Sequence, residues 1–126
     1  MLLLDTSVLI DLEHELFEQR VGRIRTLLGR RRGEDLACTT VTVGELASGA
    51  NEHSTWFLLR RLRKIPLTEA IAYRAGALDR EMSRLGRRLG ENDNWIAATA
   101  LHLSATLVFA DEAFEGVPRL KRTRIG

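Results

Sequence analysis

The stretch Leu2-Leu3-Leu4-Asp5-Thr6-Ser7 decides the fold that this sequence predicts. Three consecutive leucines are typical of a short strand that is buried on both faces, as in a parallel sheet covered by helices. Groups just beyond the carboxyl end of such a strand face the ligand crevice of an open α/β sheet. We therefore expect Asp5 to present its carboxylate at the mouth of a site. The alternative is that Asp5, Thr6 or Ser7 only caps the helix expected near Val8.

Strand-like apolar runs alternate with helical repeats along the rest of the chain. Residues 36–39 and 106–109 are typical of buried strands, whereas Pro66 restricts residues 65–67 to an edge strand. This alternation predicts an α/β fold in which one parallel sheet is sandwiched between helices. The length of 126 residues fits a single domain, residues 1–126. Helices are expected at residues 7–13, 16–29, from Thr42, 54–64, from Thr68 to Leu85 and from Asn92 or Asp93, and a strand remnant at 117–120.

Composition excludes several classes of protein. The opening apolar run is broken at Asp5 and Asp11, too early for a signal peptide, and no run approaches the length of a membrane helix. The single Cys38 cannot form an intrachain disulfide, so we expect a cytoplasmic protein with no membrane partner. The net charge is only +2, but nearly every basic residue is Arg, which suits bidentate phosphate contacts. Clusters of these bases make a polyanionic partner reasonable.

Four acids stand where expected strands end or helices begin. Asp5 follows the first strand and Asp111 the last, while Glu45 and Asp93 lie in first turns of helices. In a parallel sheet with right-handed crossovers, strand ends and following helix starts share one edge. Converging carboxylates repel one another unless they share protons or surround a cation. Hard oxygen ligands favour Mg²⁺ or Mn²⁺, and such an ion beside arginines is suited to phosphodiester hydrolysis.

Each acid also has a structural alternative. Glu45 completes a capping-box pattern that begins at Thr42, and that role competes for the same carboxylate oxygens. Asp93 is also suited to cap a helix, and Asp111 to stabilise a turn. Asn92 either orients Asp93 or begins its helix, and the sequence leaves both open.

Four segments together resemble one family. They are MLLLDTSVLIDL at residues 1–12, TVTVGELASGA at 40–50, GENDNWIAATAL at 90–101 and TLVFADEAF at 106–114. In this order they resemble the PIN-domain ribonucleases, and most closely the VapC toxins of bacterial toxin–antitoxin pairs. The resemblance covers nearly the whole chain and implies a three-layer α/β/α sandwich with a central parallel sheet.

The resemblance also implies the site. Asp5, Glu45, Asp93 and Asp111 would be the catalytic, metal-binding acids, with Mg²⁺ as cofactor and Mn²⁺ as the alternative. Thr6 or Ser7 would add a hydroxyl group near the metal. The implied activity is that of a metal-dependent endoribonuclease toxin that hydrolyses RNA with a metal-activated water.

Two other functions compete with this one. An aspartyl-phosphate protein also places an acid at a strand end. A phosphatase of this type requires a second Asp at the position of Ser7. A receiver domain requires a Lys at the end of one of its last strands, and Ala110-Asp111-Glu112 contains none. A non-catalytic RNA-binding module would use the arginines but leaves the acids unexplained. We expect RNA contacts from some of Arg60, Arg61, Arg84, Arg87 and Arg88.

The partners expected besides RNA are a cognate VapB-like antitoxin, implied by the resemblance, and a second copy of the chain, with a higher assembly between them. The segment 54–64 carries more apolar residues than one core-facing stripe needs, so Trp56 or Leu59 is expected on a partner surface. That surface would form a homodimer contact or a groove for an antitoxin helix. The alternative is a helix buried on two sides within the monomer.

Overall fold

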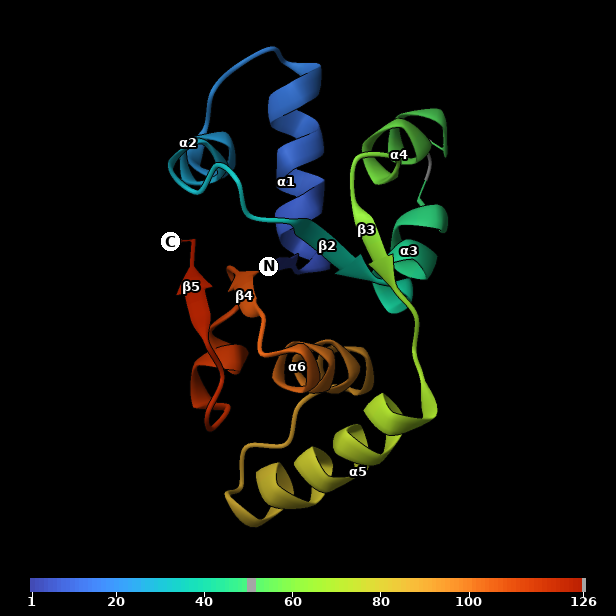
Figure 1. Cartoon of the computed structure of the whole chain (residues 1–126), viewed down its shortest axis with the longest axis vertical. Helices are drawn as coiled ribbons and strands as arrows, with labels where there is room; N and C mark the ends of the chain where they lie inside the picture. The colour runs from blue at the N-terminus through green and yellow to red at the C-terminus, as the bar shows by residue number, and fades with distance from the viewer. Residues whose placement is uncertain (50–51, 126) are drawn as a thin grey trace.

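A five-stranded parallel sheet forms the centre of the molecule (Figure 1). The structure, a computed structural model, describes residues 1–49 and 52–125. The strands follow the order β3-β2-β1-β4-β5, and every neighbouring pair is parallel. This confirms the predicted parallel α/β architecture. The strands are β1 (Leu2–Leu4), β2 (Leu36–Thr39), β3 (Arg63–Ile65), β4 (Thr106–Phe109) and β5 (Arg122–Arg124).

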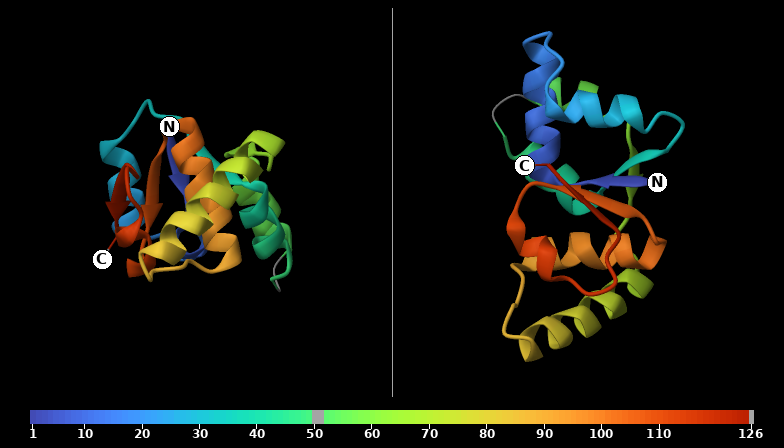
Figure 2. Two further views of the ribbon diagram at one scale, coloured as in Figure 1. Left: turned by 90° about the horizontal axis from the view of Figure 1, so that it is seen from below. Right: turned by 90° about the vertical axis from the view of Figure 1, so that its left-hand side faces the viewer.

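Helices cover both faces of the sheet, as two perpendicular views show (Figure 2). One layer contains α1 (Thr6–Phe17), α2 (Arg23–Arg30), α3 (Thr40–Ala47) and α4 (Glu52–Leu59); the other contains α5 (Glu69–Arg84) and α6 (Glu91–Leu103), with the short 3₁₀ helix η1 (Glu112–Gly116) after β4.

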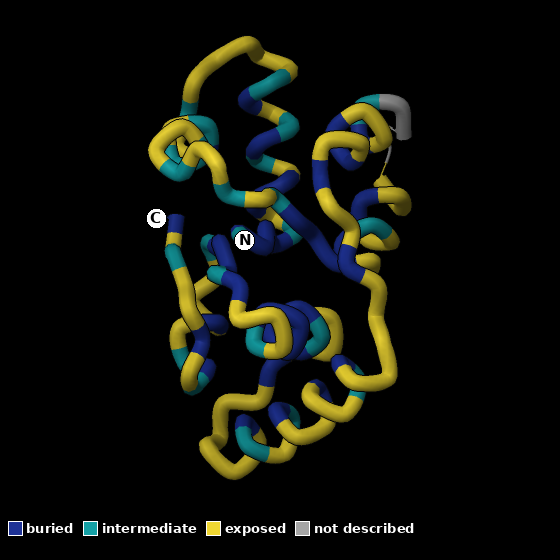
Figure 3. The backbone as a smooth tube through the Cα atoms, viewed as in Figure 1, coloured by how far each residue is buried: buried dark blue, intermediate teal, exposed yellow. Residues whose placement is uncertain are grey.

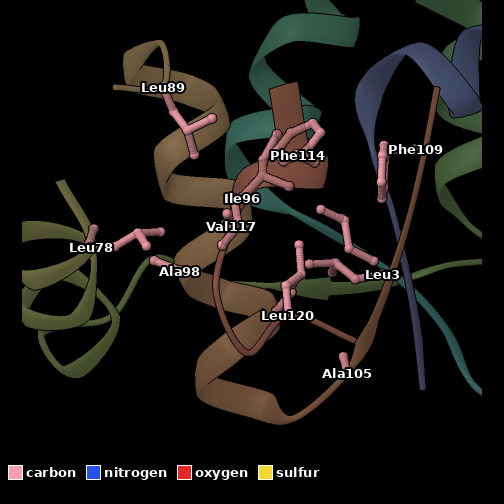
Figure 4. Packing of buried hydrophobic residues seen from close by; sticks show 14 of the residues in the cluster. Leu3, Leu78, Leu89, Ile96, Ala98, Ala105, Phe109, Phe114, Val117 and Leu120 are labelled. Carbon is pink, nitrogen blue, oxygen red and sulfur yellow. The ribbon is translucent and has the colours of Figure 1, made fainter. Parts of the chain in front are cut away.

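The three leucines of β1 fill both sides of the sheet because successive side chains of a strand point to opposite faces. Leu2 and Leu4 pack with the α1 and α4 side, whereas Leu3 packs with α5 and α6. All three are fully buried, and the dark centre of the tube in Figure 3 marks this layer. Figure 4 shows the core between the sheet and the α5 and α6 layer. In this core the ring centroids of Phe109 and Phe114 lie 5.3 Å apart. The sheet is therefore a stiff base from which the strand ends project.

The helix predicted over residues 16–29 is wrong. α1 continues to Phe17, the chain turns with a positive φ at Gln19, and α2 begins at Arg23. Phe17 and Val21 would share one face of the predicted 16–29 helix with Ile24 and Leu28, but they are 80% and 68% exposed. The repeat does not report the tertiary contact that decides this boundary, in which Glu15 holds the beginning of α2.

Glu15 is 3% exposed, and its carboxylate accepts the backbone N–H groups of Gly22, Ile24 and Arg25 at 2.9, 3.0 and 3.0 Å. These are donors that the first turn of α2 cannot satisfy by itself. Burial acts to raise the pKa of Glu15, but the three N–H donors outweigh it and hold that pKa below its usual range.

We expect Glu15→Gln to lower the free energy of unfolding by about 1–2 kcal/mol at pH 7, because it weakens charge-assisted bonds to buried donors. Since the folded pKa is depressed, this stabilisation is present above the unfolded pKa and is lost as the pH falls through the folded one. Urea unfolding at pH 7 and pH 3 measures it. Glu13→Gln on the same helix is the control, and equal losses in both variants would contradict this role.

Three other element boundaries also differ from the sequence-based expectation. The helix predicted at 54–64 ends at Leu59, and β3 begins at Arg63, where the Lys64 ammonium donates to the carbonyl oxygens of Leu59 and Leu62. The edge strand is therefore residues 63–65, not 65–67. The strand remnant expected at 117–120 is instead β5 at residues 122–124. Both strands pair in register with an inner neighbour, which a local pattern does not report.

The helix starts that position the site also differ. α3 begins at Thr40, and the Thr39 hydroxyl caps it by accepting the backbone N–H of Thr42. α6 begins at Glu91, after Gly90, and not at Asn92 or Asp93. Among the residues that the structure describes, no helix is long and apolar enough to cross a membrane.

Candidate functional site

The carboxyl end of β1 places Asp5 at the bottom of a surface hollow of about 560 Å³. The backbone N–H of Asp5 donates to Val108 of β4 at 3.0 Å, which fixes the residue to the sheet, and Asp5 is only 5% exposed. Although Asp5 is the N-cap residue of α1, its carboxylate does not make the capping hydrogen bond. It accepts the Ser7 hydroxyl at 3.0 Å instead. The hollow is lined by Asp5, Thr6, Ser7, Ile10, Glu45, Asp93, Ala110 and Asp111.

All four predicted acids therefore line one hollow, although they come from four separate elements. Helices that lead into or out of parallel strands begin at the carboxyl edge of the sheet, so α3 and α6 bring Glu45 and Asp93 to the end of β1. α5 and α6 form an antiparallel pair, and the turn between them lies at the carboxyl edge of the sheet, so α6 and Asp93 begin there (Figure 2). Asp111 lies two residues beyond β4, and one of its carboxylate oxygens caps η1 by accepting the Ala113 N–H at 2.9 Å. Asp111 thus has both its structural role and a place in the hollow.

Glu45 is held by a chain of hydroxyl groups that crosses from α3 to α1. The Thr6 hydroxyl donates to Glu45 Oε1 at 2.8 Å and is 2.9 Å from the Thr42 hydroxyl, which in turn lies 3.4 Å from that of Thr39. Since Thr6 gives its proton to Glu45, Thr42 must donate to Thr6. The alternative role for Glu45, in a capping box that begins at Thr42, does not occur, because Thr39 caps α3 and Glu45 lies in its second turn. Its carboxylate is directed toward Thr6 instead.

The electrostatics of the hollow favour either protons or a cation. Burial raises the pKa of Asp5 to about 6; the Ser7 hydroxyl and the Thr6 amide oppose this, and the charges of Asp93 and Glu45 add to it. Burial also raises the pKa of Asp93, and the charges of Asp111 and Glu45 raise it further. The four carboxylates are therefore close enough to destabilise one another's ionised forms.

The chemistry of this donor set fits a hard divalent cation. Every ionisable side chain that lines the hollow is a carboxylate, and Mg²⁺ and Mn²⁺ prefer oxygen ligands. Within residues 1–49 and 52–125, no three acidic, His or Cys side chains converge closely enough to enclose one ion by themselves. Such a spacing of carboxylates suits Mg²⁺, which in proteins usually keeps several water ligands and binds one or two carboxylates together with substrate phosphates.

The remaining predicted polar residues divide into two groups. Thr6 and Ser7 line the hollow, so both expected hydroxyl groups are present. Asn92 is exposed in the first turn of α6 and lies outside the lining; it does not begin the helix, because α6 begins at Glu91 with Gly90 as its N-cap. Thr42 and Ile10 were not anticipated as site residues. The Thr-x-x-Glu spacing was the available signal for Thr42, but it was interpreted as a cap.

The five arginines expected at the RNA surface do not line the acidic hollow as the structure describes it. Arg60 and Arg61 lie over the rings of Trp56 and Phe57, each 4.9 Å from the ring centroid. Arg84 lines a basic hollow beside α5 with Arg74, Arg80 and Arg119. Arg87 and Arg88 line a groove that includes Glu112 and Ala113, next to Asp111 in the chain. Of the five arginines, Arg87 and Arg88 therefore line the groove that lies next to the acidic hollow along the chain.

The two residues predicted for the partner surface differ in exposure. Trp56 is 58% exposed, but Leu59 is 8% exposed and packs in the core beneath α4. Phe57, at 49% exposed, is the second large apolar side chain on this surface. The local sequence shows the excess of apolar residues, but the direction of each depends on where α4 contacts the sheet.

The chain matches the family model described as PIN domain over residues 2–120. It is 30% identical to Ribonuclease VapC11 of Mycobacterium tuberculosis over 129 residues, which cover 95% of this chain and 93% of the relative. It is 40% identical to Ribonuclease VapC10 of the same species over 77 residues, 59% of this chain. That second match covers 58% of VapC10, less than two thirds of its length.

Solved structures share the fold over nearly the whole chain. VapBC2 from Rickettsia felis, bound to a DNA fragment from their promoter, matches with a TM-score of 0.80 at 19% identity, covering 99% of this chain and 98% of that one. A toxin–antitoxin complex from Klebsiella pneumoniae matches with a TM-score of 0.76 at 26% identity, covering 99% and 100%. At 19% identity, the first likeness shows the fold alone.

Proposed function

Because the chain belongs to the PIN-domain family, we propose that it is a metal-dependent endoribonuclease and the toxin of a VapBC-type toxin–antitoxin pair. The observation that carries this proposal is the convergence of Asp5, Glu45, Asp93 and Asp111 in one hollow. The names of the relatives as VapC ribonucleases support it. RNA is the proposed substrate class, and the scissile phosphate is expected at this hollow.

We propose that the four carboxylates hold Mg²⁺, or Mn²⁺ in its place, some of them directly and the others through waters bound to the ion. A divalent ion bound there supplies an activated water and neutralises the negative charge that develops on the phosphate. The chain's own residues position the ligands. Ser7 orients the Asp5 carboxylate, and Thr6 orients that of Glu45. Asp5 is largely screened from solvent and set on the central strand, so its position is held by the sheet rather than by a loop.

Incubation of labelled RNA with the purified protein tests the activity. We expect cleavage in Mg²⁺ and its loss in excess EDTA, with recovery when Mg²⁺ is restored. Binding without cleavage in Mg²⁺ would indicate a non-catalytic RNA-binding module. Acetyl phosphate labelling without cleavage would indicate an aspartyl-phosphate protein. Either result would overturn the proposal.

A VapB-like antitoxin and a second copy of the chain are the proposed protein partners, together forming a higher assembly. The likeness to VapBC2 from R. felis and to the toxin–antitoxin complex from K. pneumoniae supports an antitoxin as partner. The exposed aromatic surface of α4, formed by Trp56 and Phe57 with Arg60 and Arg61 stacked on their rings, is the proposed contact. Aromatic and Arg side chains are the groups that most often dominate binding energy at interfaces.

We expect Trp56→Ser to weaken one of these contacts by about tenfold or more, the scale of a buried aromatic anchor. Light scattering measures the mass of the free protein, and calorimetry its affinity for the protein encoded alongside. Tyr73→Ser is the control, because Tyr73 is 75% exposed on α5, in the other helix layer. A folded Trp56→Ser protein unchanged in both measurements would remove this surface from the interface.

A further inference from the structure

A second hollow, of about 680 Å³, adjoins the acidic one. The two share a continuous stretch of chain: Ala110 and Asp111 line the acidic hollow, and Glu112 and Ala113 line its neighbour. Figure 2 shows the turn before α6 beside η1, and these two segments form the walls of the second hollow. We call it the arginine groove, because Arg87, Arg88 and Arg124 line it.

Arg124 is fixed at the boundary between the two hollows. Its strand, β5, pairs with β4 so that Arg124 lies opposite Phe109, and the next residue, Ile125, donates its N–H to the Phe109 carbonyl at 2.7 Å. The Arg124 side chain then reaches forward, and its Nε donates to the carbonyl oxygen of Ala110 at 3.3 Å. This bond holds the guanidinium beside a residue that lines the acidic hollow. The terminal nitrogens of Arg124 make no ion pair among the described residues.

Arg87 lines the same groove from the turn before α6. Its side chain passes so close to Gly116 that a Cβ there would be 3.2 Å from Arg87 Cδ and 3.4 Å from Nη1. The absence of a side chain at Gly116 therefore lets Arg87 lie against η1. Like Arg124, Arg87 is exposed and forms no ion pair with the part of the chain that the structure describes.

The other charges of the arginine groove are mostly neutralised. Arg88 forms a bidentate pair with Asp79 at 3.0 and 3.3 Å, and Glu115 pairs with Arg122 at 3.2 Å. Glu112 is the remaining carboxylate of the lining, set against Arg87 and Arg124. The groove therefore retains a positive balance next to a hollow lined by four acids. An anion is favoured in the groove and a cation in the acidic hollow.

We propose that Arg124, together with Arg87 in the same groove, binds the RNA phosphate next to the scissile one. The inference rests on the proposed function, because it takes the acidic hollow as the place of cleavage. An RNA strand carries one phosphate at every nucleotide, so it can occupy both hollows at once. One phosphate then lies at the metal and the adjacent phosphate at the arginines. A guanidinium suits this contact, since its planar fork matches phosphate oxygens. Arg124 is a binding residue that sets the register of the RNA at the metal.

Binding of a fluorescent 12-nucleotide oligouridylate tests this assignment. The measurement uses the Asp5→Asn protein, so that the probe is not cleaved, and compares a second substitution at Arg124 with one at Arg32. Arg32 is an exposed arginine in the connection before β2, at the amino edge of the sheet and far from both hollows. Arg32→Gln removes the same charge from the protein and is the matched control.

We expect Arg124→Gln to weaken binding severalfold and to reduce the slope of log K against log salt by about 0.7, the value for one lost single-strand phosphate contact. Arg124→Lys should retain the slope because the charge is kept, and Arg32→Gln should change neither quantity. In the active protein, Arg124→Gln should raise KM more than it lowers kcat. Circular dichroism establishes that each variant is folded.

Equal slopes for Arg124→Gln and Arg32→Gln would overturn the inference, as would failure of the oligouridylate to bind. A loss of affinity for the antitoxin with RNA binding unchanged would assign Arg124 to that partner and would also overturn it. Failure of the proposed function has a different signature, namely no cleavage of RNA by the unsubstituted protein in Mg²⁺.

Discussion

Asp5→Asn is expected to lower the rate of RNA cleavage in Mg²⁺ by more than about 100-fold while leaving the protein folded. Even the outer-shell partners of metal ligands are commonly worth 10–100-fold in affinity or activity, so loss of a direct ligand should exceed that range. Asparagine preserves the size of the side chain and removes its charge. Asp93→Asn should have a comparable effect, since its carboxylate lines the same hollow and interacts with Glu45 and Asp111.

Single-turnover cleavage of a labelled RNA, with the protein in excess, measures this loss. Asp11→Asn provides the control, because it removes one carboxylate from the same helix, α1, at a position outside the lining of the hollow. Its rate should match that of the unsubstituted protein. Near-normal cleavage by either Asp5→Asn or Asp93→Asn would show that the assigned site is wrong.

The second large effect is on stability. Without metal, Asp5→Asn should raise the free energy of unfolding at pH 7.5 by up to about 3 kcal/mol, the equivalent of a pKa shift from 3.8 to about 6. The ionised Asp5 is disfavoured in the folded protein because it is buried near Asp93 and Glu45. Removal of that charge relieves the penalty. The same residue would thus be costly to folding and necessary for activity.

The pH dependence separates this effect from other consequences of the substitution. Since the folded pKa of Asp5 lies above the unfolded one, the protonated form stabilises the fold below pH 4, and this contribution is lost as the pH rises through about 6. Urea unfolding in EDTA should therefore show little difference between the two proteins at pH 4 and a growing difference up to pH 7.5. A difference that is constant across this range would contradict the account.

The strands that carry the acids were predictable because their signal is local. Leu2–Leu4 and Thr106–Phe109 are continuous apolar runs bounded by an acid or a turn, and β1, β2 and β4 have the predicted limits. Their carboxyl ends then had to meet at one edge by the geometry of parallel sheets. This is why the positions of Asp5 and Asp111 could be predicted with no contact known.

The features that sequence reasoning missed depend on contacts between distant residues. The Leu16–Gly29 repeat contains no sign that Glu15 will accept three N–H groups of α2 and so break the helix. Likewise Thr42 was assigned to a cap, because the Thr6 hydroxyl that it contacts lies 36 residues away in the sequence. Arg124 was overlooked for the same reason. Its place depends on β5 pairing with β4.

Binding of Mn²⁺, measured by titration calorimetry at pH 6, tests most directly whether the four-carboxylate hollow is a divalent-cation site. With a pKa of about 6, Asp5 is protonated in about half of the molecules at this pH. Binding of a cation in the hollow must therefore release, on average, a fraction of one proton per protein. We expect saturable binding with proton release, detected by comparing buffers of different ionisation enthalpy. We expect Asp5→Asn to weaken the binding and to reduce the number of protons released, with Asp93, whose pKa is also raised, as the remaining source. Absence of saturable binding, or binding and proton release that survive Asp5→Asn unchanged, would contradict the assignment of this site.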